Sequence, residues 1–397
     1  MPEPQCTARP STPPDRRGLV DTCARLNCPP LHRGFDLVPP VSFTHDGVRA
    51  DDAALDALFS AFDIGQLSLP ADGDVLFLRA RPGPWMYRDH VRDWTCLQTF
   101  KPHADQLLRH VGNVEQEIPR DRCFTMVLVL PPRQRDEARA LLAHALDCVI
   151  DGGNVVVSIA NNEGARSGQD DMEQLAGPVQ VMSKHKCRVF WTTPDSQVDR
   201  ELQTQWIALD VVQPNDDGWL SRPGLFAWNR VDLASALLAS NLPETLRGKV
   251  ADLGAGFGFL AAKALQHNPA ITHLDLYEAE ARALEPARRN LRRIADAHDR
   301  HDVSLDVIWH DVSQGLPKRY NAILSNPPFH QGRVDLPGLG QRFIEVAADA
   351  LENNGELWLV ANRHLPYETT LNARFSRVES IAQESGFKVL NATEPRR

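Results

Sequence analysis

The sequence lacks the features that would mark a membrane protein, a secreted disulfide framework or a zinc domain. Its 397 residues contain no apolar run of about 18 residues, the length that spans a membrane. The seven cysteines are odd in number and scattered, and only Cys23 and Cys28 lie close together, with no second pair to complete a zinc site. Residues 1–17 hold five prolines and no apolar core, unlike a secretory signal. We therefore expect a cytoplasmic protein with reduced thiols, no bound metal and no membrane contact.

Excess positive charge is also absent, because 43 Lys and Arg residues face 52 Asp and Glu residues, giving a net charge of −9. This balance argues against a broad, salt-driven surface for nucleic acid, so any such contact must use a local basic patch. The apolar fraction of 42% and the charged fraction of 24% are ordinary for a soluble globular protein. The length predicts two domains, or three at most.

The most informative stretch is Ile323–His330, which reads I-L-S-N-P-P-F-H. An apolar strand-like run stops there, because two consecutive prolines can neither continue a β-ladder nor enter a helix interior. In open α/β sheets, ligands bind at such carboxyl ends of strands. The Asn326 side-chain oxygen and the Pro327 carbonyl could accept both hydrogens of a planar amino group, and Phe329 could stack on its ring. Taken alone, the motif is equally typical of a structural turn, so its context decides.

A glycine-rich turn upstream supplies that context. Residues 249–260 predict a strand, a turn and a helix start, and the glycines let the backbone approach a ligand closely. Phe259 stands where a dinucleotide fingerprint would need its third glycine, which disfavours a nicotinamide cofactor. Asp252, just before the glycines, would repel a pyrophosphate but suits the positive amino group of a methionine moiety. S-adenosylmethionine is therefore the expected cofactor, with contacts from Asp252, Gly254, Ala255, Gly256 and Gly258.

Two acidic residues follow at the ends of the next predicted strands. Ile271–Glu278 predicts one strand, and Glu278 stands about 20 residues past the glycines, where an acid reaches ribose hydroxyls in such folds. Val303–Trp309 predicts another, followed by Asp311, whose carboxylate could accept from an adenine amino group. Glu280 is the alternative to Glu278 as the ribose-binding acid, and a solvated loop acid is the alternative for Asp311. Together with the glycine turn and Asn326, these acids predict a single ligand-binding rim.

The chain also contains an internal repeat. A strand, a Pro-Pro pair, a helix, a glycine-containing turn and a strand occur twice in that order, which suggests two copies of one α/β fold. The copies differ where chemistry would matter, because Leu130 precedes the first Pro pair and Asn326 the second. Arg79-Ala80-Arg81-Pro82 likewise stands where the second copy has its glycine turn. The predicted elements are 124–130, 136–148 and 154–159 in the first copy, and 320–325, 343–351 and 356–360 in the second.

In this order of motifs the sequence resembles class I S-adenosylmethionine-dependent methyltransferases, which place D-x-G-x-G-x-G, a ribose acid and N-P-P plus an aromatic residue along the chain. Asn-Pro-Pro-aromatic marks the members that methylate amino groups. More narrowly, the duplicated layout resembles the ribosomal RNA guanine-N2 methyltransferases, of the type of small-subunit methyltransferase C and large-subunit methyltransferase G, over residues 70–390. The matching stretches are Pro223–Phe226 with Asp232, Asp252–Gly258, Ser325–His330, Gly355–Leu365, Gly152–Ser167 and His185–Arg188.

The resemblance implies an α/β protein with two tandem Rossmann-like methyltransferase domains, the first degenerate and the second catalytic. Residues 1–45 would be a flexible segment, 46–212 the degenerate domain serving RNA binding or as a scaffold, and 213–397 the catalytic domain. The boundary would fall in the polar run Gln213–Asp217. Ribosomal RNA or a ribosomal subunit would be the partner, N2 of one guanine the methylated atom, and a monomer would suffice.

The resemblance also implies roles for individual residues. Asn326 and Pro327 would accept hydrogen bonds from the guanine amine, and Phe329 would stack on the base. These three would be the catalytic residues. Asn326 would also contact the cofactor. His330 and Arg363 would contact flanking phosphates. The local basic patch for folded RNA would consist of Arg166, Lys184, Lys186 and Arg188, for which a solvated charged surface is the alternative.

Other functions stay open on the sequence alone. The amine-gripping motif also fits adenine-N6 methylation of nucleic acid or methylation of a protein glutamine. A protein of another class, a non-catalytic RNA-binding assembly factor, could keep the same fold. The intact cofactor motif and Asn326 argue against that alternative.

Overall fold

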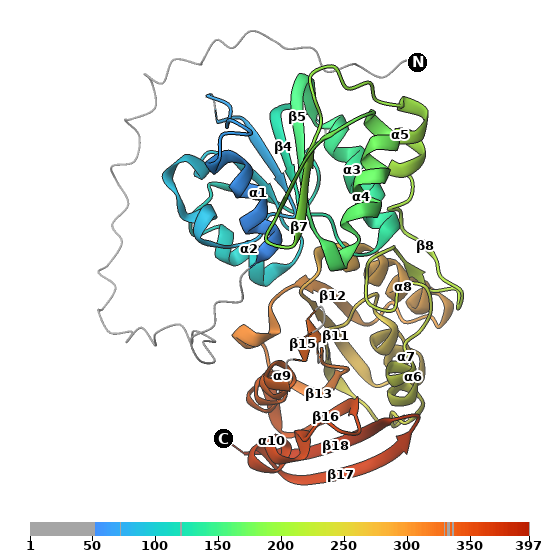
Figure 1. Ribbon diagram of the computed structural model, residues 1–397. Helices are drawn as coiled ribbons and strands as arrows, with labels where there is room; N and C mark the ends of the chain where they lie inside the picture. Colours follow the sequence, from blue (N-terminus) through green and yellow to red (C-terminus); the bar gives the residue numbers. More distant parts are fainter. Residues whose placement is uncertain are drawn as a thin grey trace, which may run out of the picture.

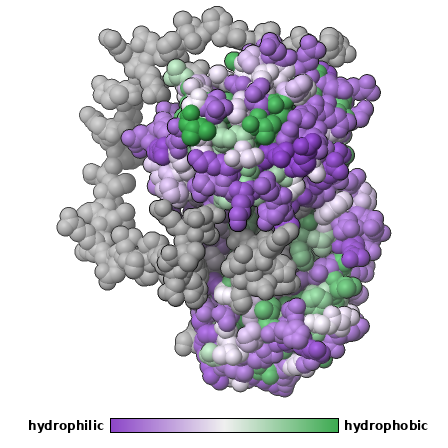
Figure 2. Space-filling model, in the orientation of Figure 1, coloured by the Kyte–Doolittle hydropathy of each residue, from purple (hydrophilic) through white to green (hydrophobic). Residues whose placement is uncertain are grey.

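The computed structural model describes residues 52–71, 73–119, 121–328, 330–331, 334–335 and 337–396. Predictions for residues 1–51 and for Phe329 lie outside this part of the chain, as does the His330 side chain. Two α/β halves lie one above the other, the first coloured blue to green and the second olive to red (Figure 1). Hydrophilic residues dominate the face seen in Figure 2, with apolar residues in separate groups. Within the described ranges, no helix is long and apolar enough to cross a membrane.

The first half is built on a seven-stranded sheet in the order β3-β2-β1-β4-β5-β7-β6. Its strands pair in parallel except at β5–β7 and β6–β7. The strands are β1 (Val75–Leu78), β2 (Thr95–Leu97), β3 (Asn113–Glu115), β4 (Phe124–Val129), β5 (Val149–Ala160), β6 (Gln180–Lys184) and β7 (Cys187–Trp191). The helices are α1 (Ala53–Asp63), α2 (Lys101–Leu107), α3 (Arg135–Asp147), α4 (Ala165–Ala176) and α5 (Arg200–Ile207).

The second half repeats this architecture, with the sheet order β12-β11-β10-β13-β16-β18-β17. Its strands are β10 (Gly248–Leu253), β11 (Ile271–Glu278), β12 (Ser304–Trp309), β13 (Tyr320–Ser325), β16 (Leu351–Asn362), β17 (Phe375–Glu384) and β18 (Phe387–Pro395). Its helices are α6 (Leu233–Ser240), α7 (Phe259–His267), α8 (Leu284–Ala297), α9 (Pro337–Ala350) and α10 (Tyr367–Arg374). Two short hairpins complete it, β8 (Gln213–Pro214) with β9 (Leu220–Ser221) and β14 (His330–Gln331) with β15 (Val334–Asp335).

The identical strand orders confirm the predicted repeat of a Rossmann-like fold. The pairing register of the strands aligns the two halves residue by residue. Leu78 pairs with Val129 in the first sheet, and Leu253 pairs with Ser325 in the second. Leu130 and Asn326 therefore occupy equivalent places. Each sheet is covered on both faces, which explains why its central strands are continuous apolar runs rather than alternating ones.

The predicted glycine turns before β5 and β16 are bulges inside these strands rather than turns between elements. Both strands pair on either side of the bulge, where the register shifts by several residues. A Cβ on Gly153 would lie 2.6 Å from the Thr125 carbonyl oxygen, and one on Gly355 would lie 3.0 Å from that of Glu352. Glycine is therefore required at 153, where backbone passes too close for a side chain, and is favoured at 355, where the approach is tight.

The two halves meet where β2 and β11 end. Phe100 and Glu280 form an isolated antiparallel bridge between them. The Trp309 indole Nε1 donates to backbone oxygens on both sides, Thr99 at 3.0 Å and Ala279 at 2.8 Å. The loop that follows Glu278 is thus fixed by the first half. Two hydrogen bonds flank the bridge, from Lys101 N to Ala279 O (2.8 Å) and from Ala281 N to Thr99 O (2.9 Å).

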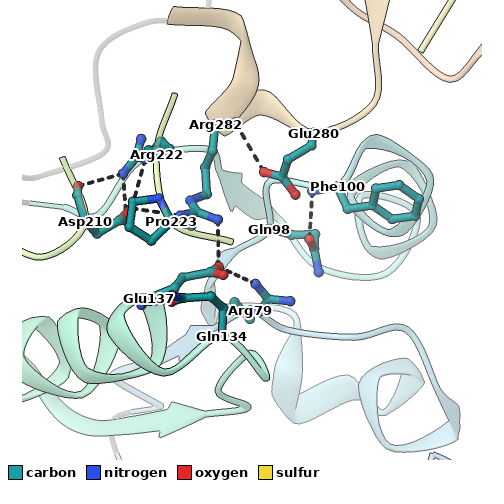
Figure 3. A network of polar contacts seen from close by, with 10 residues as sticks. All are labelled: Arg79, Gln98, Phe100, Gln134, Glu137, Asp210, Arg222, Pro223, Glu280 and Arg282. Carbon is teal, nitrogen blue, oxygen red and sulfur yellow. Dashed lines mark hydrogen bonds and ion pairs between the residues drawn. The ribbon is translucent and has the colours of Figure 1, made fainter. Parts of the chain in front are cut away.

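Arg282 forms the polar centre of this junction (Figure 3). Its guanidinium, with 12% of the side chain exposed, donates to Glu137 at 2.7 Å and to Asp210 at 2.7 Å. It also donates to the Pro223 carbonyl oxygen at 2.6 Å. Glu137 accepts a further 2.7 Å hydrogen bond from Arg79. Burial raises the pKa of the Glu137 carboxyl, and the two arginines oppose that rise.

Candidate active site

The glycine turn between β10 and α7 forms the floor of the candidate site. Gly254, Gly256 and Gly258 all have positive φ angles, of 72°, 53° and 84°. These angles favour glycine and keep side chains away from the surface of the turn. The N-terminal end of α7 follows at once, where free backbone N–H groups favour polar or anionic ligand atoms.

Asp252 lies beneath this turn with no exposed surface. Its Oδ2 accepts a 3.0 Å hydrogen bond from Ala261 N, whereas its Oδ1 is buried and has no partner among the described residues. Burial raises the pKa of Asp252 to about 7, with the Glu278 carboxylate adding to the rise. Asp252 Oδ1 thus lacks a hydrogen-bond donor, and the buried carboxyl lacks a positive charge that would stabilise its ionised form. A cationic donor, such as the amino group of S-adenosylmethionine, would supply both.

Glu278 joins the end of β11 to the glycine turn. Its Oε2 accepts from Gly256 N at 2.7 Å and its Oε1 accepts from Glu280 N at 2.8 Å. Burial raises the pKa of the Glu278 carboxyl, and these backbone donors oppose the rise. The carboxylate is thereby held on the rim beside the turn, where the sequence predicts a ribose-binding acid.

Asp311 lies one strand further along the same rim, after β12. Its Oδ1 accepts from Ser313 N at 2.9 Å, so it caps the short 3-10 helix Val312–Gln314. A contact to adenine remains a prediction for this residue. The parallel order β12-β11-β10-β13 brings Asp311, Glu278, the glycine turn and Asn326 to one edge of the sheet, in that sequence.

Asn326 is held by a hydrogen-bond pair that sequence reasoning missed. Its Nδ2 donates to Asp232 Oδ2 at 3.0 Å and to Ser235 Oγ at 2.9 Å. The N-cap signal of an Asp before an apolar helical run does identify Asp232, which caps α6. Its second contact depends on tertiary structure and leaves no sequence signal. Pro327 is buried, and the role of Phe329 stays a prediction.

A pocket lies between the α6 region and the glycine turn. The exposed ring of Phe226 and the side chains of Asp232, Ser235 and Asn326 contribute to it, as do Gly254 and Gly256. The residues predicted to bind the cofactor at the glycine turn and the amine at Asn326 thus line one cavity. The other lining residues are Ala227, Val231, Ala255, Phe257, Phe259 and Leu260.

The predicted RNA-contacting residues lie apart from this pocket lining. Lys184 and Lys186 are exposed around the turn between β6 and β7. Arg166 pairs with Asp170 at 3.0 Å, and Arg188 donates to the Gln169 side chain. Arg363 is exposed after β16 in the second half. Within the described ranges, no group of three or more His, Cys, Asp or Glu side chains could hold a metal ion.

Comparison with known proteins identifies the family. Residues 218–391 match the model of the methyltransferase small domain. The chain is 31% identical over 306 residues to a ribosomal RNA small subunit methyltransferase C from Serratia proteamaculans, covering 76% of this chain and 85% of that protein. It is 28% identical over 271 residues to the protein of that name from Psychromonas ingrahamii, covering 68% of this chain and 75% of that protein.

A solved structure matches nearly the whole chain. It is the T. thermophilus 16S rRNA N2 G1207 methyltransferase in complex with AdoMet and guanosine, with a TM-score of 0.70 and 22% identity. The match covers 87% of this chain and 92% of that one, so the two share the two-domain fold. On the strength of these sequence relatives, the chain belongs to the ribosomal RNA small subunit methyltransferase C family.

Proposed function

We propose that this protein transfers a methyl group from S-adenosylmethionine to N2 of a guanine in small-subunit ribosomal RNA. The observation that carries the proposal is the common cavity of Asn326 and the glycine turn, in a chain whose relatives are named for this RNA. The T. thermophilus protein of the same fold is described as acting on N2 of G1207 in 16S rRNA. The corresponding guanine is the proposed target here.

The cofactor site would be formed by the turn and rim described above. Gly254, Ala255, Gly256 and Gly258 would line the methionine moiety, with Asp252 Oδ1 balancing its positive amino group. Glu278 would hold the ribose and Asp311 the adenine edge. S-adenosylmethionine supplies the electrophilic methyl group.

The protein's own contribution is orientation of a weak nucleophile. The lone pair of the guanine amine is delocalised into the ring, so the amine must be made more pyramidal before it reacts. Asn326 Oδ1 and the Pro327 carbonyl would accept its two hydrogens and direct the lone pair at the methyl donor. Such positioning can lower the barrier by roughly 7–11 kcal/mol. No strong general base is required, because the nitrogen becomes acidic once methylated.

The target base must leave its helix to reach this pocket. Phe329 would then stack on it, while His330 and Arg363 would contact the flanking phosphates. We propose that the first half holds folded RNA through Lys184 and Lys186, with Arg166 and Arg188 beside them. We also propose that the protein works as a monomer in the cytoplasm, with domains divided as 46–212 and 213–397.

The test is transfer of labelled methyl groups to naked 16S rRNA, isolated small and large subunits, and total protein. We expect N2-methylguanine in small-subunit RNA, and a loss of about 100- to 1,000-fold in kcat for Asn326→Ala, because one charge-orienting acceptor is removed. Binding of S-adenosylhomocysteine to this variant should weaken only slightly, because Asn326 is one predicted cofactor contact beside those of Asp252, Glu278 and the glycine turn, so the loss in kcat reports on the amine site. Label in adenine or in a protein glutamine would contradict the substrate, and cofactor binding absent from the wild type would favour a non-catalytic RNA-binding factor.

A further inference from the structure

Neighbouring side chains fix the orientation of the Asn326 amide, that is, the directions in which its nitrogen and its oxygen point. Both hydrogens of its amide nitrogen have an acceptor, Asp232 Oδ2 at 3.0 Å and Ser235 Oγ at 2.9 Å. A carboxylate can only accept hydrogen bonds, so the amide cannot turn its oxygen towards Asp232 without placing two acceptors together. The amide oxygen therefore stays directed away from this pair.

The two holding side chains are themselves anchored. Asp232 Oδ2 also accepts from Ser235 N at 2.9 Å, as the N-cap of α6. The preceding residue is fixed by Asp217, whose carboxylate accepts from Val231 N at 2.7 Å. Leu238 on the same helix is fully buried in the core of the second half. The position of Asp232 is thus set by contacts within the second half.

The first half provides an internal comparison. Its helix α1 begins at the equivalent place with Asp52 as N-cap, which accepts from Leu55 N at 3.1 Å. The acid that caps the helix is therefore present in both copies. The two residues that hydrogen-bond to each other beside this acid in the second half are replaced in the first. A buried Leu55 stands in place of Ser235 and a buried Leu130 in place of Asn326. Helix capping explains the Asp in both copies, but it does not explain the Ser and Asn, which occur together only where the cofactor turn is intact.

We infer that Asp232 and Ser235 are positioning residues that force Asn326 to present only its carbonyl oxygen to the substrate. A site with such a fixed acceptor takes a group that donates hydrogen, an amine, and disfavours a carbonyl oxygen at the same place. The selectivity for an amino over an oxo group would then reside in this three-residue unit. The inference rests on the proposed function.

Asp232→Asn tests the inference with little disturbance of the fold, because Asn is as good an N-cap as Asp. The new amide can donate as well as accept, so Asn326 is free to rotate. We expect kcat for small-subunit RNA to fall by about 10- to 100-fold, as for other displaced catalytic groups, with KM and the affinity for S-adenosylhomocysteine unchanged. Ser235→Ala, which removes one acceptor and keeps a good helix former, should cause a smaller loss.

Exchanging the two side chains, Asn at 232 and Asp at 326, distinguishes a positioning role from a purely structural one. Asn326→Asp alone would set two carboxylates against each other. Combined with Asp232→Asn, the side chain at 326 again has one donor partner and a free acceptor oxygen, so the double variant should exceed Asn326→Asp at least severalfold. Asp217→Asn is the matched control, since it removes the same charge from the same segment, keeps an oxygen that accepts from Val231 N and does not touch Asn326, and it should retain the wild-type kcat.

The outcomes separate this inference from the proposed function. Wild-type kcat in Asp232→Asn, or a double variant no better than Asn326→Asp, would overturn the positioning role while leaving the enzyme established. An inactive wild type would instead overturn the proposed function. Thermal unfolding of each variant, together with Ser235→Ala, keeps the result decisive if one variant folds poorly.

Discussion

The two halves of this chain have the same strand order, but they differ at four places on the rim where the second half has predicted site residues. Where the second half has Asp252, Gly254, Glu278 and Asn326, the register of the first sheet places Phe77, Arg79, Gln98 and Leu130. The acidic and amide groups are replaced by apolar or uncharged ones, and the glycine by an arginine. The first half therefore has the fold of the second without the groups predicted to serve methyl transfer.

Several residues of the first rim keep the backbone geometry of the second. Arg79 has a positive φ of 55°, close to the 72° of Gly254. Gln98 Oε1 accepts from Phe100 N at 2.8 Å, as Glu278 Oε1 accepts from Glu280 N at 2.8 Å. These residues reproduce the turn while serving the junction, where Arg79 meets Glu137. The comparison teaches that the rim of the first half contacts the second half at the place where the second half carries its predicted cofactor residues.

The largest effect is expected from Gly254→Arg, which gives the second rim the residue of the first. Arg79 shows that an arginine can adopt this conformation, and a Cβ at Gly254 would make only an ordinary 3.5 Å contact with Phe343. The long side chain would fill the cofactor cavity, so methyl transfer and S-adenosylhomocysteine binding should both be lost. The left-handed conformation should cost about 1–2 kcal/mol of folding free energy. Retained cofactor binding, measured by calorimetry on the folded variant, would contradict the assigned cavity.

The junction offers the next largest effect. Arg282→Met keeps an apolar stem but leaves Glu137 and Asp210 facing each other, and breaking such a buried pair costs about 3–5 kcal/mol. We expect the low end of that range, because Arg79 and Arg222 still contact the two carboxylates. Denaturant unfolding measures it. Arg289→Met is the control, since its exposed pair with Glu285 should contribute no more than about 0.5 kcal/mol. Equal losses in the two variants would show that the junction is not a stabilising contact.

A smaller effect is the dependence of stability and cofactor affinity on pH. It distinguishes the two rims because Asp252 titrates and its counterpart Phe77 does not. Burial raises the pKa of Asp252 from 3.8 to about 7, so the unfolded chain loses this proton first and stability falls as pH rises from about 4 to about 7. A cationic ligand favours the ionised carboxylate. The affinity for S-adenosylmethionine should therefore fall by up to about tenfold for each pH unit below 7.

Calorimetric titration between pH 5 and 8 measures this dependence. Asp252→Asn should bind the cofactor more weakly and show a flat profile across the same range. An unchanged slope in that variant would assign the titrating group to another residue.

Much of the fold could be predicted from the sequence, because the central strands are buried on both faces and end at strong breakers. Ile271–Glu278 and Tyr320–Ser325 have the predicted bounds, the latter ended by Pro327 after Asn326. The helix predicted at 343–351 begins earlier, at Pro337, and ends at Ala350, so that Leu351 is the first residue of β16. Short-range patterns do not reveal how far a strand continues past a bulge, which is why β5 and β16 are longer than predicted.

The candidate site was predictable only in part. Gly254 and Asn326 each follow a strand and Glu278 ends one, and a parallel sheet must bring such residues to one edge. The contact from Asp232 to Asn326 joins residues far apart in the sequence, and so does the Arg282 junction. No local periodicity records such pairs. Asp252 was predicted near the cofactor, but its complete burial depends on the packing of α7 over β10.

The number of cofactor molecules bound per chain tests the contrast between the two rims most directly. We would titrate the full-length protein with S-adenosylhomocysteine and determine the stoichiometry by calorimetry. One molecule per chain is the expected result, and Gly254→Arg should abolish it while Arg79→Gly leaves it intact. Two molecules per chain, or one that disappears in Arg79→Gly and survives in Gly254→Arg, would contradict the assignment of catalysis to the second half.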